Sequence, residues 1–187
     1  MEKIEIEKAV EILKKGGTIL YPTDTIWGIG CDATNVDAIE KVFKIKQRDK
    51  TKNLIILVES ERRLQEYVNV PSLAWDLIDL SNKPLTIIYD NPQNLPKTLI
   101  SDKNTIGIRL THDPFCKKLI SKLNKPIVST SANISGESSP ENFSSISSKI
   151  LEGVDYIINL RHEEIKKYAS SSIIQLSEDG RIKVIRE

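Results

Sequence analysis

Two short polar clusters, far apart in the chain, have the residue types needed to hold a phosphorylated ligand. They are residues 46–48 (Lys-Gln-Arg) and residues 129–133 (Ser-Thr-Ser-Ala-Asn). Arginine presents a planar fork to phosphate oxygens, lysine acts as a compact point charge, and hydroxyl and amide groups supply further hydrogen bonds. Together the two clusters indicate a nucleotide site that holds a polyphosphate beside a small polar substrate.

The cation pair can converge on one ligand only if a helix ends there. Residues two apart on a helix point to different sides, so we predict that the helix containing Lys46 stops before Arg48. Residues 49–53 are polar or charged throughout, which supports such an end and would bring Lys52 close to the pair. Taken alone, this cluster favours the alternative of a solvated basic helix end that complements the helix dipole.

The hydroxyl cluster follows an apolar segment and predicts the end of a buried strand. Side chains alternate along a strand, so Ser129 and Ser131 share a face if that strand continues. Asn133 and Gly136 would then open a turn whose backbone N–H groups are available to an anionic ligand. The alternative is an ordinary polar turn after a core strand, and this cluster alone leaves the two interpretations equally balanced.

A third segment contains a misleading pattern. Residues 28–33 (Gly-Ile-Gly-Cys-Asp-Ala) match the G-x-G-x-x-A fingerprint of dinucleotide-binding folds. In a true fingerprint the first glycine closes the strand, whereas here Pro22 ends the preceding strand much earlier. We therefore interpret residues 22–30 as a loop. Residues 23–25 (Thr-Asp-Thr) lie where open α/β sheets bind ligands, with a purely structural capped turn as the alternative.

Apolar periodicity predicts that helices and strands alternate along the chain. Helices are expected near residues 6–13, 36–43, 60–67, 71–80, 114–123 and 141–150, and strands over 18–21, 54–58, 85–89, 105–110, 127–129, 156–159, 172–176 and 182–185. This alternation predicts a single three-layer α/β domain over residues 1–187, a length that suffices for one full core. The serine-rich residues 135–148 are expected to be an exposed, mobile connection and a candidate lid.

Composition narrows the class of protein. The 187 residues are 39% hydrophobic and 28% charged, and the charges nearly cancel to +1, which argues against global attraction to nucleic acid or an anionic membrane. No apolar run is long enough to cross a bilayer. Cys31 and Cys116 stand alone and no signal-like segment opens the chain, so a cytoplasmic location is expected. His112 and His162 lack neighbours at zinc-ligand spacing.

Five separate blocks resemble the YrdC-like family and occur in the order seen there. The blocks are residues 21–28 (Tyr-Pro-Thr-Asp-Thr-Ile-Trp-Gly), 46–48 (Lys-x-Arg), 106–109 (Ile-Gly-Ile-Arg), 126–136 (Pro-Ile-Val-Ser-Thr-Ser-Ala-Asn-x-Ser-Gly) and 171–174 (Ser-Ser-Ile-Ile). The likeness extends from Thr18 to Arg186 and is closest to the short form of the threonylcarbamoyl-AMP synthases. It implies a single-domain α/β fold, in which helices cover a twisted mixed sheet with an open concave cavity.

The resemblance also implies a reaction. L-Threonine and bicarbonate would form an N-carboxylated threonine, whose carboxylate attacks the α-phosphate of ATP to give threonylcarbamoyl-AMP and pyrophosphate. Mg²⁺ would accompany ATP, and other proteins would transfer the threonylcarbamoyl group to tRNA. Lys46 and Arg48 would be catalytic through electrostatic stabilisation. The implied ATP-binding residues are Arg48, Lys52, Thr105, Ser131, Asn133, Ser139 and Arg186, and the implied threonine-binding residues are Thr25, Arg109, Ser129 and Ser171.

Some residues differ from the family pattern, and two other functions are compatible with the same fold. Residues 82–84 (Asn-Lys-Pro) stand where the family often has Pro-Gly-Pro, Asp24 replaces the commoner glutamate, and Leu57 lies where some members place a histidine. The YciO-like branch lacks the combined Lys-x-Arg and Ser-x-Asn patterns, so their presence favours the synthase. A catalytically silent RNA-binding module of the same fold is the alternative, although near-zero charge and the lack of interleaved basic and aromatic residues argue against it.

Overall fold

The computed structural model describes residues 1–164 and 169–187. In these residues the helices are α1 (Glu2–Lys14), α2 (Val36–Lys46), α3 (Glu61–Gln65), α4 (Ser72–Leu80), α5 (Pro114–Leu123) and α6 (Ser148–Gly153), with short 3₁₀ turns η1 (Lys97–Leu99) and η2 (Phe143–Ser145). The strands are β1 (Thr18–Tyr21), β2 (Gly28–Cys31), β3 (Ile55–Val58), β4 (Leu85–Asp90), β5 (Thr105–Leu110), β6 (Ile127–Ser131), β7 (Tyr156–Ile157), β8 (Ser172–Leu176) and β9 (Ile182–Arg186).

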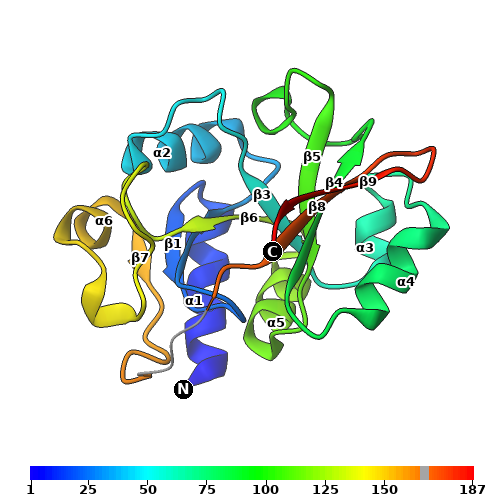
Figure 1. Cartoon of the computed structure of the whole chain (residues 1–187). Coiled ribbons are helices and arrows are strands. Elements are labelled where there is room, and N and C mark those ends of the chain that lie inside the picture. Colours follow the sequence, from blue (N-terminus) through cyan, green and yellow to red (C-terminus); the bar gives the residue numbers. More distant parts are fainter. Residues whose placement is uncertain (165–168) are drawn as a thin grey trace.

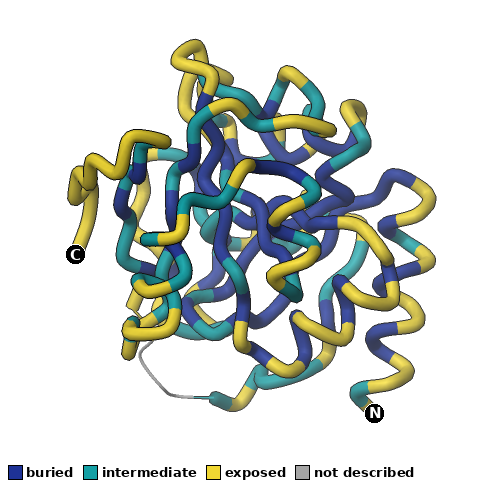
Figure 2. The backbone as a smooth tube through the Cα atoms, turned by 90° about the vertical axis from the view of Figure 1, so that its right-hand side faces the viewer, coloured by how far each residue is buried: buried dark blue, intermediate teal, exposed yellow. Residues whose placement is uncertain are grey.

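Within the described residues, nine strands form one sheet in the order β7-β1-β2-β6-β3-β5-β4-β8-β9. The pairs β1–β7, β3–β5 and β4–β8 are parallel and the other neighbours are antiparallel. The prediction of a mixed sheet with helices on its faces is therefore confirmed (Figure 1). The C-terminal strand β9 is an edge strand, exposed along its length (Figure 2).

The two faces of the sheet carry separate hydrophobic clusters. Ile56 and Val58 of β3 join the cluster that contains side chains of α2, α3, α4 and α6, whereas Leu57 between them joins the cluster formed with α1 and α5. This alternation is the period of two expected of a strand buried on both sides. The helices α1 and α5 pack side by side on the second face (Figure 1). The core thus has the three layers that the sequence predicted.

Local interactions fix both the start and the end of α2. Asn35 caps the first turn, because its side chain accepts a 3.0 Å hydrogen bond from the Ala38 backbone N–H. Gln47 adopts the left-handed conformation with φ of 48°, which stops the helix directly after Lys46. The predicted helix end between Lys46 and Arg48 is therefore confirmed.

The interpretation of residues 22–30 as one loop is wrong at its C-terminal end. Residues 28–31 form β2, which pairs antiparallel with β1 and with β6. Glycine permits this strand to lie in the centre of the sheet, because a Cβ at Gly30 would lie 2.7 Å from both the Val128 carbonyl oxygen and Cε1 of Tyr21. The glycines that imitate a dinucleotide fingerprint therefore serve close strand packing.

The predicted helix over residues 141–150 is also wrong. The chain instead forms the 3₁₀ turn η2 and then α6, which begins at Ser148. Side-chain hydrogen bonds compete with a continuous helix here: Asn142 accepts from the Ser145 backbone N–H, and the Ser145 hydroxyl donates to the Asn142 carbonyl at 2.9 Å. Phe143 packs in parallel on His162 with ring centroids 3.7 Å apart. The mobility of residues 135–148 stays a prediction.

Gly30 gives a direct test of this packing. We expect Gly30→Ala to lower the free energy of unfolding by about 1–3 kcal/mol, because the added methyl group overpacks the centre of the sheet. Gly28 is a matched control on the same strand, since the nearest atom to its Cβ position lies 3.4 Å away. Urea unfolding of both variants measures the difference. Equal stability of the two variants would contradict the close approach at Gly30.

Candidate active site

An open pocket of about 230 Å³ lies over the sheet face that also packs against α1 and α5. Its lining consists of residues from six strands (β2, β3, β5, β6, β8 and β9) and from the segments around them: Thr25, Ile26, Trp27, Gly28, Arg48, Asn53, Leu54, Ile55, Arg109, Ser129, Thr130, Ser131, Ser139, Ser170, Ser171, Ile173 and Arg186. Among these lining residues three carry a positive charge and none a negative one. The pocket is therefore suited to an anionic ligand.

Strand register sets the floor of the pocket. Ser129 lies opposite Ile55 of β3, and Ser131 lies opposite Gly28 of β2. Since side chains alternate along a strand, this places both serines on one face, as the sequence predicted for a continuing strand. The absence of a side chain at Gly28 keeps the floor open, because a Cβ there would lie 3.4 Å from the Ser129 hydroxyl oxygen.

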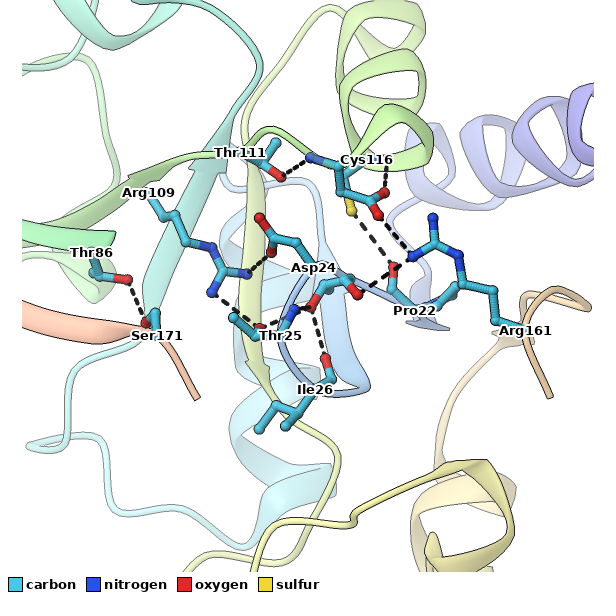
Figure 3. A network of polar contacts seen from close by, with 12 residues as sticks. Pro22, Asp24, Thr25, Ile26, Thr86, Arg109, Thr111, Cys116, Arg161 and Ser171 are labelled. Carbon is cyan, nitrogen blue, oxygen red and sulfur yellow. Dashed lines mark hydrogen bonds and ion pairs between the residues drawn. The ribbon is translucent and has the colours of Figure 1, made fainter. Parts of the chain in front are cut away.

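Arg109 is the most buried charge of the pocket, with 3% of its side chain exposed. Its Nη2 lies 3.2 Å from Oδ1 of Asp24, and its Nη1 donates a 3.1 Å hydrogen bond to the Thr25 hydroxyl (Figure 3). Within the part of the chain that the structure describes, the buried Nε of Arg109 has no hydrogen-bond partner. The guanidinium is thus held by one wall and keeps donor capacity for a ligand.

The loop between β1 and β2 presents Thr25 through its own hydrogen bonds. The Thr23 hydroxyl donates to the Ile26 carbonyl at 2.8 Å and accepts from the Thr25 backbone N–H at 3.0 Å. The hydroxyl oxygens of Thr23 and Thr25 are 2.9 Å apart. Asp24 is thereby turned toward Arg109 while Thr25 faces the pocket, so the Thr-Asp-Thr sequence works as one unit.

The C-terminal strand contributes a second arginine. Arg186 donates from Nε and Nη2 to the Ser171 carbonyl at 2.9 and 2.7 Å, and the Ser171 hydroxyl lies 2.9 Å from that of Thr86. Burial, and then the positive charge of Arg109, lower the pKa of Arg186. The two guanidinium groups therefore repel each other across the pocket, and an anion between them would relieve that repulsion.

Arg48, also in the pocket lining, is held by the turn that follows α2. Its Nε donates to the Lys52 carbonyl at 3.0 Å, and its Nη2 donates to the Asn53 carbonyl at 2.9 Å. Burial lowers the pKa of Arg48 as well. These bonds use the backbone of Lys52, whose side chain is exposed and does not line the pocket.

Lys46, unlike Arg48, lies outside the pocket lining. Its side chain is fully buried, and its ammonium group donates to the backbone carbonyls of Ser131 and Asn133, the latter at 2.7 Å. Asn133 in turn donates from Nδ2 to the Ile134 and Glu137 carbonyls at 2.9 and 2.8 Å. Lys46 thus ties the end of α2 to the turn after β6 and lies behind the pocket lining.

The predicted site residues divide into two groups by position. Those that line the pocket are Thr25, Arg48, Arg109, Ser129, Ser131, Ser139, Ser171 and Arg186, and those outside the lining are Lys46, Lys52, Thr105 and Asn133. Thr105 is buried, and its hydroxyl oxygen lies 2.7 Å from that of Ser101. All four residues predicted to hold threonine therefore share one pocket, and the binding roles of both groups stay predictions.

Sequence reasoning missed the apolar part of the lining. Trp27, Ile55 and Ile173 contribute apolar surface, and Trp27 also packs against Phe143 and His162 with centroid distances of 5.0 and 5.5 Å. An isoleucine in a strand has the same sequence signature whether a helix or a pocket covers it. Only the position of α1 and α5, which leave this part of the sheet uncovered, distinguishes the two cases.

Several other kinds of site find no support in the described residues. In residues 1–164 and 169–187 no group of three or more His, Cys, Asp or Glu side chains is placed to hold a metal ion. Cys31 and Cys116 are free and buried, and burial raises the pKa of both thiols. No described helix has the length and apolar character needed to span a bilayer.

The fold and pocket define a mixed α/β protein with an arginine-lined, hydroxyl-rich cavity on its central sheet. Residues 11–187 match the family model of the Sua5, YciO and YrdC proteins, which is described as "Telomere recombination". The chain belongs to this family.

Relatives of both branches are similar to this chain. The threonylcarbamoyl-AMP synthase of Pseudoalteromonas translucida (strain TAC 125) is 35% identical over 158 residues, which cover 82% of this chain and 84% of that protein. The structure of P. abyssi Sua5 complexed with L-threonine has a TM-score of 0.82 at 25% identity, and it covers 94% of this chain. E. coli YciO has a TM-score of 0.83 at 27% identity, covering 100% of this chain and 90% of YciO. This chain spans 52% of the Sua5 chain.

The position of Lys46 predicts a titration that can be measured. Burial, and then the charge of Arg48, lower the pKa of Lys46 to about 8. We expect an NMR titration of the Lys46 side chain to have its midpoint near that pH and not at the ordinary value near 10.5. A midpoint at the ordinary value would contradict the observed burial.

The same shift predicts how stability depends on pH. At pH values between about 8, the pKa of Lys46 in the folded protein, and its ordinary value of 10.5, Lys46 is protonated in the unfolded chain but largely neutral in the folded one. The contribution of this group to the free energy of unfolding therefore rises with pH in this range. Lys46→Met cannot titrate and is the reference. The free energy of unfolding of the wild type minus that of Lys46→Met, measured with urea, should therefore be larger at about pH 9.5 than at about pH 7.

Proposed function

We propose that the chain is a threonylcarbamoyl-AMP synthase, which condenses L-threonine, bicarbonate and ATP to threonylcarbamoyl-AMP and pyrophosphate. One observation carries the proposal: Arg109 and the hydroxyls of Thr25, Ser129 and Ser171 line the same pocket as Arg48 and Arg186. The similarity to curated synthases and to a Sua5 structure with bound L-threonine supports it. The presence of both the Lys-x-Arg and Ser-x-Asn patterns favours this activity over a YciO-like one.

The threonine end of the pocket is the wall built by Arg109. Its guanidinium, oriented by Asp24 and Thr25, binds the carboxylate of threonine through charge-assisted hydrogen bonds. The hydroxyls of Ser129, on β6, and of Ser171, just before β8, line the same pocket and bind the polar groups of the amino acid. The fixed substrate amine can then attack the carbon of bicarbonate close to the nucleotide: the N–C bond forms, a C–O bond of bicarbonate breaks, and the oxygen leaves as water with a proton from the amine.

The nucleotide end extends toward Arg48, Ser131, Ser139 and Arg186. The pocket volume of about 230 Å³ is below the range of about 300–1,000 Å³ typical of small-molecule sites. The reacting groups therefore occupy this open pocket, and the rest of ATP extends beyond it. Mg²⁺ would accompany ATP and offset part of the charge of its phosphates; among the described residues no group of three or more carboxylate, imidazole or thiol side chains is placed to hold the ion.

Lys46 acts behind this site. Its bonds to the Ser131 and Asn133 carbonyls fix the turn that follows β6, and its positive charge adds to the field of Arg48. Lys46 thus contributes electrostatic stabilisation without touching the phosphates, and Asn133 contributes by shaping the same turn. Lys52 and Thr105, which the family resemblance predicts to bind ATP, lie outside the pocket lining, so we propose an indirect contribution instead: Lys52 through its backbone bond to Arg48, and Thr105 through its place in β5.

The chemistry needs no covalent intermediate with the protein. An oxygen of the N-carboxylated threonine forms a bond with the α-phosphorus, the bond from that phosphorus to the bridging oxygen breaks, and pyrophosphate leaves with the electron pair. Negative charge grows on the leaving group, and Arg48 and Arg186 stabilise it. The buried thiols of Cys31 and Cys116 have raised pKa values and take no part.

The product is an activated acyl adenylate, so it must be used by another protein. We propose that the partners are the proteins that transfer the threonylcarbamoyl group to tRNA, and that the enzyme works with them in the cytoplasm. Direct RNA binding by this chain has weaker support, because the charges of the sequence nearly cancel to +1.

Pyrophosphate release tests the proposed function. We expect the purified chain to release pyrophosphate from ATP only when L-threonine and bicarbonate are both present. Titration with tRNA at increasing salt concentration, run on the same preparation, tests the alternative of an RNA-binding module. Salt-sensitive RNA binding without any turnover would replace the synthase by that module.

Replacing Arg48 tests the phosphate end specifically. We expect Arg48→Ala to reduce the rate of pyrophosphate release by about a hundredfold, because a donor to the developing charge is lost. Stability should change little, since the bonds of Arg48 lie in an exposed turn. Arg62→Ala is the matched control, because 92% of the Arg62 side chain is exposed and it does not line the pocket. Equal rates in the two variants would refute the role of Arg48.

A further inference from the structure

Arg161 has an unfavourable backbone conformation and lies outside the pocket lining. Its φ is 59°, in the left-handed region that non-glycine residues rarely adopt. Such a conformation persists only where surrounding contacts fix it. Its side chain is accordingly only 26% exposed, which is low for an arginine in a connecting segment.

The strongest contact of Arg161 is an ion pair at the start of α5. Its Nη1 lies 2.7 Å from Oδ2 of Asp113, a carboxylate of which 5% is exposed. The other oxygen of Asp113 caps α5 by accepting a 2.9 Å hydrogen bond from the Cys116 backbone N–H. Arg161 therefore compensates the charge of a buried cap and is itself held in one orientation (Figure 3).

Two longer contacts join this ion pair to the β1–β2 loop. The Nη1 of Arg161 donates to the Thr23 carbonyl at 3.5 Å, and the Cys116 thiol donates to the Pro22 carbonyl at 3.6 Å. Figure 3 shows Arg161 and Cys116 on the same side of this loop, and Asp113 contacts both of them. The backbone at residues 22–23 is thus held from outside the pocket.

The same loop carries the groups that face the pocket. The Thr23 and Thr25 hydroxyls are in contact, and the Thr25 hydroxyl accepts from Arg109. Asp24, between them, forms the ion pair with Arg109. A continuous series of polar contacts therefore leads from Arg161 to the guanidinium that lines the pocket.

We propose that Arg161 is a positioning residue that holds the β1–β2 loop so that Thr25 and the Arg109–Asp24 pair are preorganised for the amino-acid substrate. The inference rests on the proposed function, because it names threonine as the ligand of that wall. It assigns Arg161 no contact with either substrate. Its effect is confined to the threonine end, since Arg48 and Arg186 have their own backbone partners.

The variant Arg161→Gly tests the role of the side chain without adding backbone strain. Glycine adopts a positive φ without strain, so this change removes the guanidinium while relaxing the conformation at residue 161. Arg161→Lys retains a positive charge for Asp113 without the fork of the guanidinium. Arg181→Ala is the matched control, because Arg181 also pairs with an aspartate, Asp179 at 2.7 Å, but 83% of its side chain is exposed.

The first measurement is amide hydrogen exchange, which does not depend on activity. Exchange in the peptide that covers residues 22–27 should accelerate in Arg161→Gly and stay unchanged in Arg181→Ala, because the loop loses its outer support. The second measurement is pyrophosphate release at varied substrate concentration. In Arg161→Gly the KM for threonine should rise roughly tenfold, whereas the KM for ATP should stay within about twofold. Arg161→Lys should restore part of the affinity for threonine.

The outcomes distinguish the role of Arg161 in the loop from the proposed function of the protein. Unchanged exchange in Arg161→Gly overturns the inference, whether or not the wild type is active. Faster exchange with an unchanged KM for threonine also overturns it, as does an equal rise in both KM values, which would indicate general destabilisation. A wild type that shows no dependence on threonine sinks the proposed function, and the exchange measurement then still decides whether Arg161 holds the loop.

Discussion

The gathering of three partly buried arginines in one pocket, two of which (Arg109 and Arg186) repel each other, is the constraint on which the site depends. Burial lowers the pKa of Arg48 and, together with the charge of Arg109, that of Arg186. Asp24 forms an ion pair with Arg109 and offsets only part of this charge. A ligand with several negative charges would remove the remaining repulsion, so the charge of the pocket favours anionic ligands.

The sheet topology brings these charges together from distant parts of the chain. Arg109 lies on β5, Arg186 on the edge strand β9 and Arg48 just after α2. The antiparallel insertion of β6 between β2 and β3 adds the serines that form the floor. Because α1 and α5 cover only part of this face, the rest stays open as a pocket. A change in the order or register of these strands would therefore separate the three arginines and abolish the pocket.

Much of this arrangement could be predicted from the sequence. The end of α2 followed from the polar residues after Lys46, and the shared face of Ser129 and Ser131 followed from strand alternation. The four residues predicted to bind threonine line one pocket. Their common position could be expected because a family resemblance over most of the chain supplied the spatial order that spacing alone does not contain.

The features that could not be predicted depend on long-range packing. β2 was interpreted as a loop because its glycines suggest a turn, whereas they permit close approach to Val128 in the centre of the sheet. Lys46 was expected to face a ligand, but its ammonium group is bound by two carbonyls from β6 and the following turn. The contact between Arg161 and Asp113 joins segments that no local pattern connects.

The central claim is that one pocket holds ATP and L-threonine side by side. Calorimetric titration of ATP in bicarbonate-free buffer, with and without saturating L-threonine, tests it most directly, because the two ligands then bind without reacting. A shared pocket predicts that threonine changes the affinity for ATP by about fivefold or more. Identical ATP affinity in the two titrations, or no binding of ATP at all, would contradict the account.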